Sequence, residues 1–232
     1  MSRTGKKGSR KIGEMSDGSS DRLEPLTSLD LRSCSSVSEL VEAMGRCSFG
    51  ARSVGEAAQV IERMVEDKDC FKVLTLSGAM TPAKMGLVIC DMIDLGMADA
   101  VISTGHGMVE SAGLTHFKYN ESMSDTDLYH KGYNRIYDTI ELEKSLDDME
   151  VIFRKVVEDV SEKYESLSSF ELNWLIGEYL AKNTSEHQRG ILKSAYLRKV
   201  PVYVPSFTDS ELGLDFGVYL RRMKLQKKKG VM

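Results

Sequence analysis

His106 and Glu110 are the two side chains whose types and spacing best suit acid–base chemistry in this sequence. His106 lies between Gly105 and Gly107, and Glu110 follows it one helical turn further along the chain. A histidine beside a carboxylate is a common arrangement for a general base. In the alternative interpretation, the two glycines form a turn and His106 lies on its surface.

A second group of polar residues follows the last predicted strand, at Asp209, Ser210 and Glu211. Their carboxylates could bind the hydroxyls of a ribose or the nitrogens of a polyamine. Capping of the next helix is an equally good interpretation, because Asp and Ser are favoured N-cap residues. Both interpretations remain open from the residues alone.

The other histidines and the cysteines show no pattern of metal ligation or disulfide formation. The spacing of His116, His130 and His187 does not match that of metal ligands. The cysteines include no CxxC pair, and Cys90 lies inside an apolar helical stretch. We therefore expect no metal, and reduced thiols in a cytoplasmic protein.

The elements that must position these residues lie between Val73 and Gly113. Val73–Leu76 is a short apolar run that ends at Ser77-Gly78, which predicts a buried strand. Thr81-Pro82 predicts the start of a helix, because Thr caps well and Pro is tolerated at the first helical position. Gly96 stands where a left-handed residue would end that helix.

Ala98–Ser103 predicts a second strand, which completes a strand–helix–strand unit. Because such crossovers are right-handed, the loops Ser77–Thr81 and Ser103–Gly107 both open at the carboxyl edge of a parallel sheet. Free amides there attract phosphate and other anions. The first loop lacks the glycines of a dinucleotide fingerprint and the lysine of a P-loop. A structural crossover, whose glycines only form turns, is therefore the alternative.

Capping boxes and apolar stripes predict helices around this sheet. Ser36, Ser53 and Ser168 each precede a glutamate at the spacing of a capping box. Leu146–Tyr164 predicts a long amphipathic helix, and Val200–Pro205 a further parallel strand. The helix after Ser53 is expected to turn its apolar residues inward, namely Val54, Ala57, Ile61, Met64 and Val65. We predict an α/β fold, with a Rossmann-like sheet of three or more parallel strands flanked by helices.

Length and composition are those of an ordinary soluble globular protein. The chain has 232 residues, of which 41% are hydrophobic and 28% charged, and its net charge of −4 offers no general attraction for nucleic acid. No apolar run approaches the length of a membrane span. We expect residues 1–24 to be a disordered basic, Ser/Gly-rich tail, 25–220 to form the domain, and 221–232 to be a basic tail. Trp174, at helical spacing, is interpreted as a core residue rather than a ligand-stacking one.

Four blocks of sequence, taken in order, resemble the deoxyhypusine synthase family. The blocks are Phe49–Ala57, Val73–Gly113, Lys131–Ile136 and Pro205–Asp209, and the similarity extends from about Leu29 to about Gly217. The resemblance implies NAD-dependent transfer of the aminobutyl group of spermidine to a lysine of a translation initiation factor, through an imine on an enzyme lysine. It also implies a homo- or hetero-oligomer, tetrameric in the family, with sites at subunit interfaces.

The resemblance assigns roles to individual residues. The NAD-contacting positions of the family correspond here to Ser77, Gly78, Thr81, Thr104, Gly105, His106, Glu110 and Asp209. Polyamine-binding positions correspond to Glu110, Glu211 and Asp215, although Glu211 occupies a serine position and Asp215 lies one position late. Gly78 replaces an asparagine, and Val109 replaces an acid. These departures leave other amines or guanidines open as substrates.

The catalytic lysine implied by the resemblance has no counterpart here, so the catalytic residue stays unknown and the fold is expected to be truncated at its C-terminus. The lysines of residues 221–232 form a solvated tail that does not suit imine chemistry. Three hypotheses remain. The chain is the N-terminal part of a transferase whose catalytic half is supplied elsewhere, a non-catalytic paralogue that completes the NAD site of an active partner, or a nucleotide- or amine-binding module without transfer activity.

Overall fold

The computed structural model of the protein describes residues 20–77, 80–105, 115–120, 122–161, 163–164 and 166–228. The chain divides into two compact units, Met1–Asp67 and Lys68–Met232. The domain limits expected from the sequence, near residues 24 and 220, stay predictions. Among the described residues, no helix is both long enough and apolar enough to cross a bilayer.

The first unit contains the helices η2 (Leu31–Ser33), α1 (Val37–Gly45) and α2 (Phe49–Glu66). The predicted capping residue Ser36 is confirmed, since its hydroxyl accepts a hydrogen bond from the amide of Glu39 at 3.2 Å. The Glu39 carboxylate in turn accepts from the amide of Ser35 at 2.7 Å. Both halves of a capping box are therefore present, with the carboxylate half displaced by one residue.

Helix α2 begins earlier than predicted. The expected start at Ser53 is wrong, because α2 starts at Phe49 with Ser48 as its N-cap residue. Ser53 lies in the second turn, where its hydroxyl donates to the carbonyl of Phe49 at 3.3 Å. A serine inside a helix can bond to the carbonyl one turn back, and this contact takes up the hydroxyl that was expected to cap the helix.

Helices α1 and α2 pack through a pair of glycines. A Cβ added at Gly55 would collide with the backbone of Gly45, so the helices approach more closely than side chains would allow. Val54, Ile61 and Val65, expected to face inward, are instead 49%, 42% and 40% exposed. They lie on the surface of α2 that α1 leaves open.

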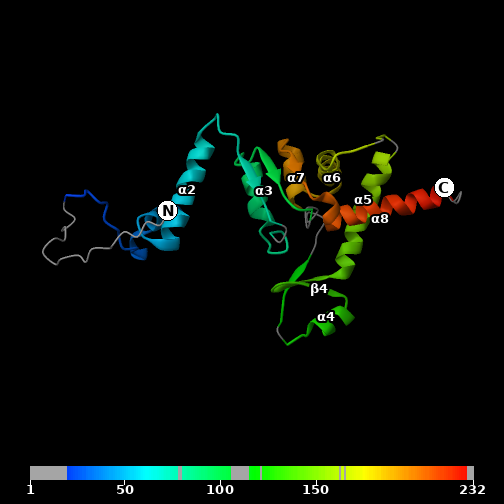
Figure 1. Cartoon of the computed structure of the whole chain (residues 1–232), viewed down its shortest axis with the longest axis horizontal. Helices are drawn as coiled ribbons and strands as arrows, with labels where there is room; N and C mark the ends of the chain where they lie inside the picture. Colours follow the sequence, from blue (N-terminus) through cyan, green and yellow to red (C-terminus); the bar gives the residue numbers. More distant parts are fainter. Residues whose placement is uncertain are drawn as a thin grey trace, which may run out of the picture. The chain divides into compact units, whose positions relative to one another are not determined.

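The second unit is built around a parallel sheet with the strand order β1-β2-β6. These strands are β1 (Val73–Thr75), β2 (Ala100–Ile102) and β6 (Val202–Tyr203), each within a predicted strand. Leu74 is in register with Val101, and Val101 with Val202. The predicted α/β fold with a parallel sheet flanked by helices is confirmed (Figure 1).

The core of this unit lies on one face of the parallel sheet. It contains residues from α3 (Gly86–Asp94), α5 (Glu143–Ser161), α6 (Ser169–Asn183), α7 (Ile191–Arg198) and α8 (Glu211–Lys228). Val101 and Val202 are buried against these helices. On the other face, Val73, Ile102 and Tyr203 keep 45%, 38% and 43% of their surface exposed.

Helix α3 starts later than predicted but ends where predicted. The expected start at Thr81-Pro82 is wrong, because the chain turns at Lys84, whose φ of +62° cannot continue a helix, and α3 begins at Gly86. At the other end, Gly96 has a φ of +76° and the amide of Met97 donates to a carbonyl of the last helical turn at 2.8 Å. This is the Schellman ending that Gly96 predicts.

A second, antiparallel sheet has no counterpart among the predicted elements. Its strands are β3 (His116–Lys118), β4 (Tyr133–Ile136) and β5 (Thr139–Leu142), in the order β3-β5-β4, with helix α4 (Asp125–His130) beside them. Ser124 caps α4 through a reciprocal box with Asp127. This small sheet lies at the opposite end of α5 from α6 (Figure 1).

Candidate functional site

The two predicted binding loops begin beside each other at the ends of β1 and β2. The amide of Leu76 donates to the carbonyl of Ile102 at 2.9 Å, so the pairing of the strands continues up to the residue before Ser77. Ser77 itself is exposed, whereas Thr81 is buried. Both hydroxyl residues therefore lie in this loop, but only Ser77 is accessible.

The loop after β2 is tied to the end of β6. The amide of Ser103 donates to the carbonyl of Tyr203 at 2.9 Å. Beyond it, Thr104 is exposed and Gly105 is buried. The carboxyl ends of all three parallel strands are thus joined by backbone hydrogen bonds at one edge of the sheet.

Several predicted site residues fall outside what the structure describes. The residues Gly78, His106 and Glu110 are among them, so the proposed acid–base pair stays a prediction. For Asp209, Glu211 and Asp215 only the backbone is described. Asp209 ends the 3-10 helix η4 (Phe207–Asp209), while Glu211 and Asp215 lie one turn apart in α8.

Ser210 connects the loop after β6 to helix α8. Its hydroxyl donates to the carbonyl of Phe207 at 2.6 Å and accepts from the amide of Gly213 at 3.2 Å. A serine that accepts from the amide three residues later is an N-cap. Of the two interpretations open for residues 209–211, capping is therefore confirmed for Ser210.

The loops after β2 and β6 touch each other at Gly105 and Ser210. A Cβ added at Gly105 would lie 2.7 Å from the Cβ of Ser210 and 3.2 Å from that of Leu212. The absence of a side chain at Gly105 is therefore what lets the two loops meet. The family resemblance predicts that Gly105 is a site residue. The structure shows that Gly105 has a packing role.

This edge of the sheet presents exposed hydroxyls at Ser77 and Thr104 beside a contact between two backbone loops. Hydroxyls and free amides at the carboxyl ends of parallel strands are suited to binding phosphate and ribose. Among the side chains that the structure describes, no group of three or more His, Cys, Asp or Glu is placed to hold a metal ion.

A buried acid–base pair, missed by sequence reasoning, lies in the antiparallel sheet. His116 Nε2 and a carboxylate oxygen of Glu141 are 3.1 Å apart, and their side chains are only 2% and 5% exposed. The residues are cross-strand partners on β3 and β5, far apart in sequence, so only the strand register brings them together. The pair links strands β3 and β5 and does not belong to the edge of the parallel sheet.

The fold and the gathered loops place the chain in the class of α/β proteins whose ligand sites form at the carboxyl edge of a parallel sheet. The family model for deoxyhypusine synthase matches residues 39–231, which is most of the chain. The chain therefore belongs to the deoxyhypusine synthase family, as its resemblance predicts. The match continues past Gly217, where the resemblance seen in the sequence ends.

Individual relatives agree with this family. The chain is 31% identical over 204 residues to a probable deoxyhypusine synthase of Archaeoglobus fulgidus, covering 86% of this chain and 65% of the relative. It is 34% identical over 196 residues to one of Methanosarcina mazei, covering 82% and 56%. The chain thus spans between about half and two thirds of the length of these relatives.

A solved structure supports the fold. A crystal structure assigned to a deoxyhypusine synthase of Entamoeba histolytica superposes with a TM-score of 0.58, covering 87% of this chain and 67% of that one. The two sequences are only 12% identical over this region, so the likeness shows a shared fold.

Proposed function

We propose that this chain binds NAD at the carboxyl edge of its parallel sheet and takes part in the deoxyhypusine synthase reaction. That reaction transfers the aminobutyl group of spermidine to a lysine of a translation initiation factor. Bound NAD would supply the hydride acceptor for the oxidation of the amine. By analogy with the family, the protein acts in the cytoplasm as a homo- or hetero-oligomer, with a tetramer as the family's form.

The single observation that carries the proposal is the contact between Gly105 and Ser210. This contact brings the loops after β2 and β6 together within the region that the family model matches. Ser77 and Thr104 add exposed hydroxyls at neighbouring strand ends. Hydroxyl and amide donors at the carboxyl ends of parallel strands fit the phosphates and riboses of a dinucleotide.

The binding roles proposed for single residues follow the resemblance to the family. The residues proposed to hold NAD are Ser77, Gly78, Thr81, Thr104, Gly105, His106, Glu110 and Asp209. Thr81 is buried, so its proposed role is to support the loop from below. Glu110, Glu211 and Asp215 are proposed to bind the amine, since carboxylates pair with its charged nitrogens. Another amine or a guanidine is the alternative substrate.

The transfer step is not assigned to a lysine of this chain. Lys193 is the lysine that the structure buries among the residues it describes. Its ammonium group donates to Thr184 Oγ1 at 3.0 Å and to the carbonyls of Ser185 and Gln188 at 2.7 and 3.1 Å. All three partners lie between α6 and α7, so this lysine does not suit an imine. The observation favours a second candidate function, a subunit that completes the NAD site of an active partner.

NAD binding by the full chain tests the proposal directly, with Gly105→Ala as the decisive variant. The added Cβ would push Ser210 away, so we expect NAD affinity in calorimetry to fall about fivefold or more. Gly217→Ala is the matched control, because nothing lies within 4 Å of a Cβ at that helical glycine. Adding Ser210→Gly to Gly105→Ala makes room for the Cβ and should restore binding.

The proposal fails if the chain does not bind NAD, or if Gly105→Ala binds it as well as the parent. A transfer assay with spermidine and the initiation factor then separates the two candidate functions. Activity of the chain alone supports the transferase. Activity that appears only when a catalytic family member is added, and that Gly105→Ala reduces, supports the completing subunit.

A further inference from the structure

A cavity of about 230 Å³ opens beside the first turns of helix α6. Its walls come from the segment between α5 and α6 and from α6 itself, and the lining residues are Tyr164, Leu167, Phe170, Glu171, Trp174 and Leu175. None of them belongs to the loops that follow β1, β2 or β6. The cavity is therefore separate from the sheet edge proposed to bind NAD.

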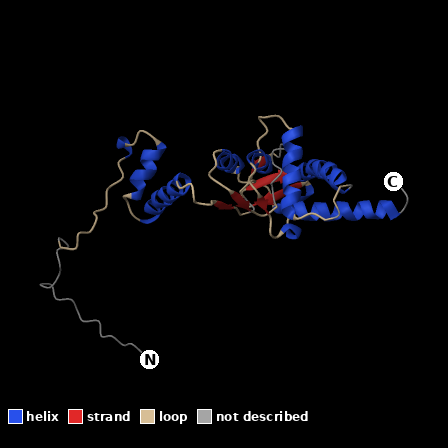
Figure 2. Ribbon diagram, turned by 90° about the horizontal axis from the view of Figure 1, so that it is seen from above, coloured by secondary structure: helices blue, strands red, loops and turns tan. Residues whose placement is uncertain are grey.

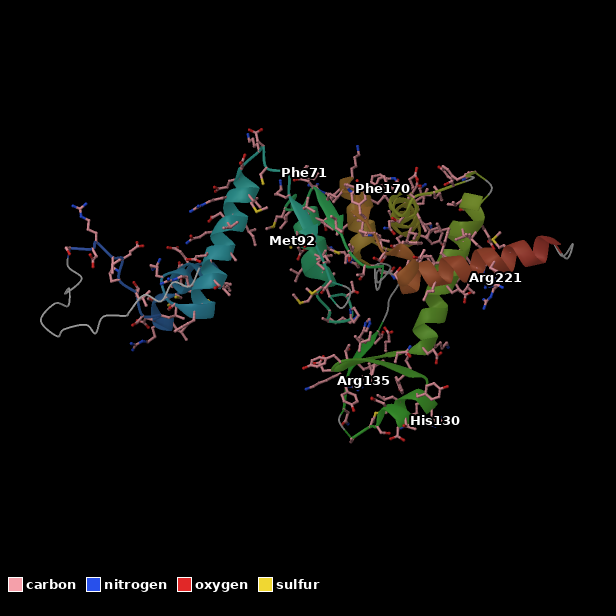
Figure 3. The ribbon with its side chains drawn as sticks, viewed as in Figure 1. Phe71, Met92, His130, Arg135, Phe170 and Arg221 are labelled. Carbon is pink, nitrogen blue, oxygen red and sulfur yellow. The ribbon has the colours of Figure 1, made fainter. Side chains whose placement is uncertain are left out.

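Aromatic rings form one wall of this cavity and are held in place from behind. Phe170 and Trp174 lie one turn apart on α6, with ring centroids 6.2 Å from each other. Phe170 stacks on Tyr203 at 5.5 Å, and Trp174 meets the ring of Tyr196 edge-on at 5.1 Å. Phe170 is labelled in Figure 3. Trp174 is half-buried: its ring packs against Tyr196 and also lines the cavity. The prediction of a core position therefore holds only in part.

Among the lining residues that the structure describes, Glu171 carries the charge. Hydrogen bonds from the amide and the hydroxyl of Ser168, both at 2.8 Å, lower the pKa of Glu171, which is therefore ionised at neutral pH. The N-terminus of α6 carries only about half a positive charge, so the full negative charge of Glu171 exceeds it. The part of the lining that the structure describes contains no lysine or arginine. The cavity therefore disfavours anions.

From this combination we propose that the cavity binds a small organic cation with an apolar body. Its ammonium group sits on the faces of Trp174 and Phe170, with Glu171 as its counter-charge. Aromatic faces attract cations through the ring quadrupole, and tryptophan does so most strongly. Leu167 and Leu175 contact the apolar part. The inference stands apart from the proposed function, because the two sites share no residue.

Trp174 is the only tryptophan of the chain, so its fluorescence reports occupancy of this cavity. The full chain would be titrated with choline and, separately, with the uncharged carbon isostere of choline. We expect a saturable fluorescence change with choline at millimolar concentrations and an affinity for the isostere that is several-fold weaker. Sodium acetate should produce no saturable change.

Two variants test the roles of the charge and the ring. Glu171→Gln keeps the capping box, because glutamine serves at that position, and should weaken choline binding several-fold without changing the isostere. Phe170→Leu keeps apolar volume but removes a ring face, and should also weaken choline. Glu186→Gln, which changes an exposed carboxylate between α6 and α7 outside the cavity, is the control. Equal affinity for choline and its isostere, no saturable change with choline, or an unaltered Glu171→Gln variant would each overturn the proposal.

Discussion

At the scale of single residues, Lys193 shows how strongly one side chain can fix a loop. Its ammonium group is buried, and the three acceptors around it are a hydroxyl and two carbonyls from the segment between α6 and α7. Hydrogen bonds to a charged group are stronger than neutral ones. The lysine therefore stabilises the conformation of the α6–α7 connection.

We predict that Lys193→Met destabilises the protein by about 1–3 kcal/mol, because it leaves buried carbonyls unsatisfied while keeping most of the apolar stem. Urea denaturation followed by circular dichroism measures this. Lys182→Met is the control, since Lys182 makes an exposed one-turn ion pair with Glu178 that is worth below about 0.5 kcal/mol. Equal effects of the two substitutions would contradict the structural role.

At the scale of helices and strands, the elements that the sequence predicts well are those marked by local chemistry. The boxes at Ser36 and Ser168 and the ending at Gly96 depend on contacts within a few residues, and all three are confirmed. Ser53 shows the limit of such signals. The same box pattern lies inside α2, because Ser48 supplies an earlier start that no pattern singled out.

The elements that the sequence misses depend on distant pairing. Strands β3, β4 and β5 are three or four residues long and mix charged with apolar side chains, so no apolar run marks them. The pair His116–Glu141 exists only through their register. Likewise, the contact of Gly105 with Ser210 joins loops about a hundred positions apart. The sequence could name residues of the candidate site but not the contact that gathers them.

Helix packing in the first unit gives a prediction at this scale. Gly55→Ala places a Cβ against the backbone of Gly45, and we expect it to destabilise the α1–α2 pair by about 1–3 kcal/mol. Gly50→Ala is the control, because nothing lies within 4 Å of a Cβ there, and a helical alanine is favoured by up to about 1 kcal/mol. Amide hydrogen exchange in α1 and α2 would measure both. Similar protection in the two variants would show that the close approach is not needed.

At the scale of the whole molecule, the second unit presents a sheet face that the described residues leave partly exposed. Val73 and Ile102 project from neighbouring strands on that face, opposite the buried Val101, whereas the ring of Tyr203 on β6 stacks on Phe170 of α6. Parallel sheets are normally covered on both faces, because their strands are apolar on both sides. An exposed apolar surface of this kind favours association with another protein surface.

We therefore predict concentration-dependent self-association of the full chain in sedimentation velocity. Val73→Thr combined with Ile102→Thr should shift the population toward monomer without unfolding, since threonine is well suited to strands. The matched control is Val218→Thr, an exposed apolar residue of α8 away from the sheet face. A parent chain that stays monomeric at micromolar concentrations would contradict this prediction.

The contact between Gly105 and Ser210 also has a mechanical consequence. Ser210 is the first fixed point of α8, a helix of 18 residues, or about 27 Å, that leads away from the sheet (Figure 2). Further along, α8 is also bonded to α5, since the hydroxyl of Tyr219 donates to Glu158 at 2.8 Å and the guanidinium of Arg222 to Glu150 at 3.2 Å. A displacement of the loop after β2 would therefore be passed through Ser210 and along α8 to α5.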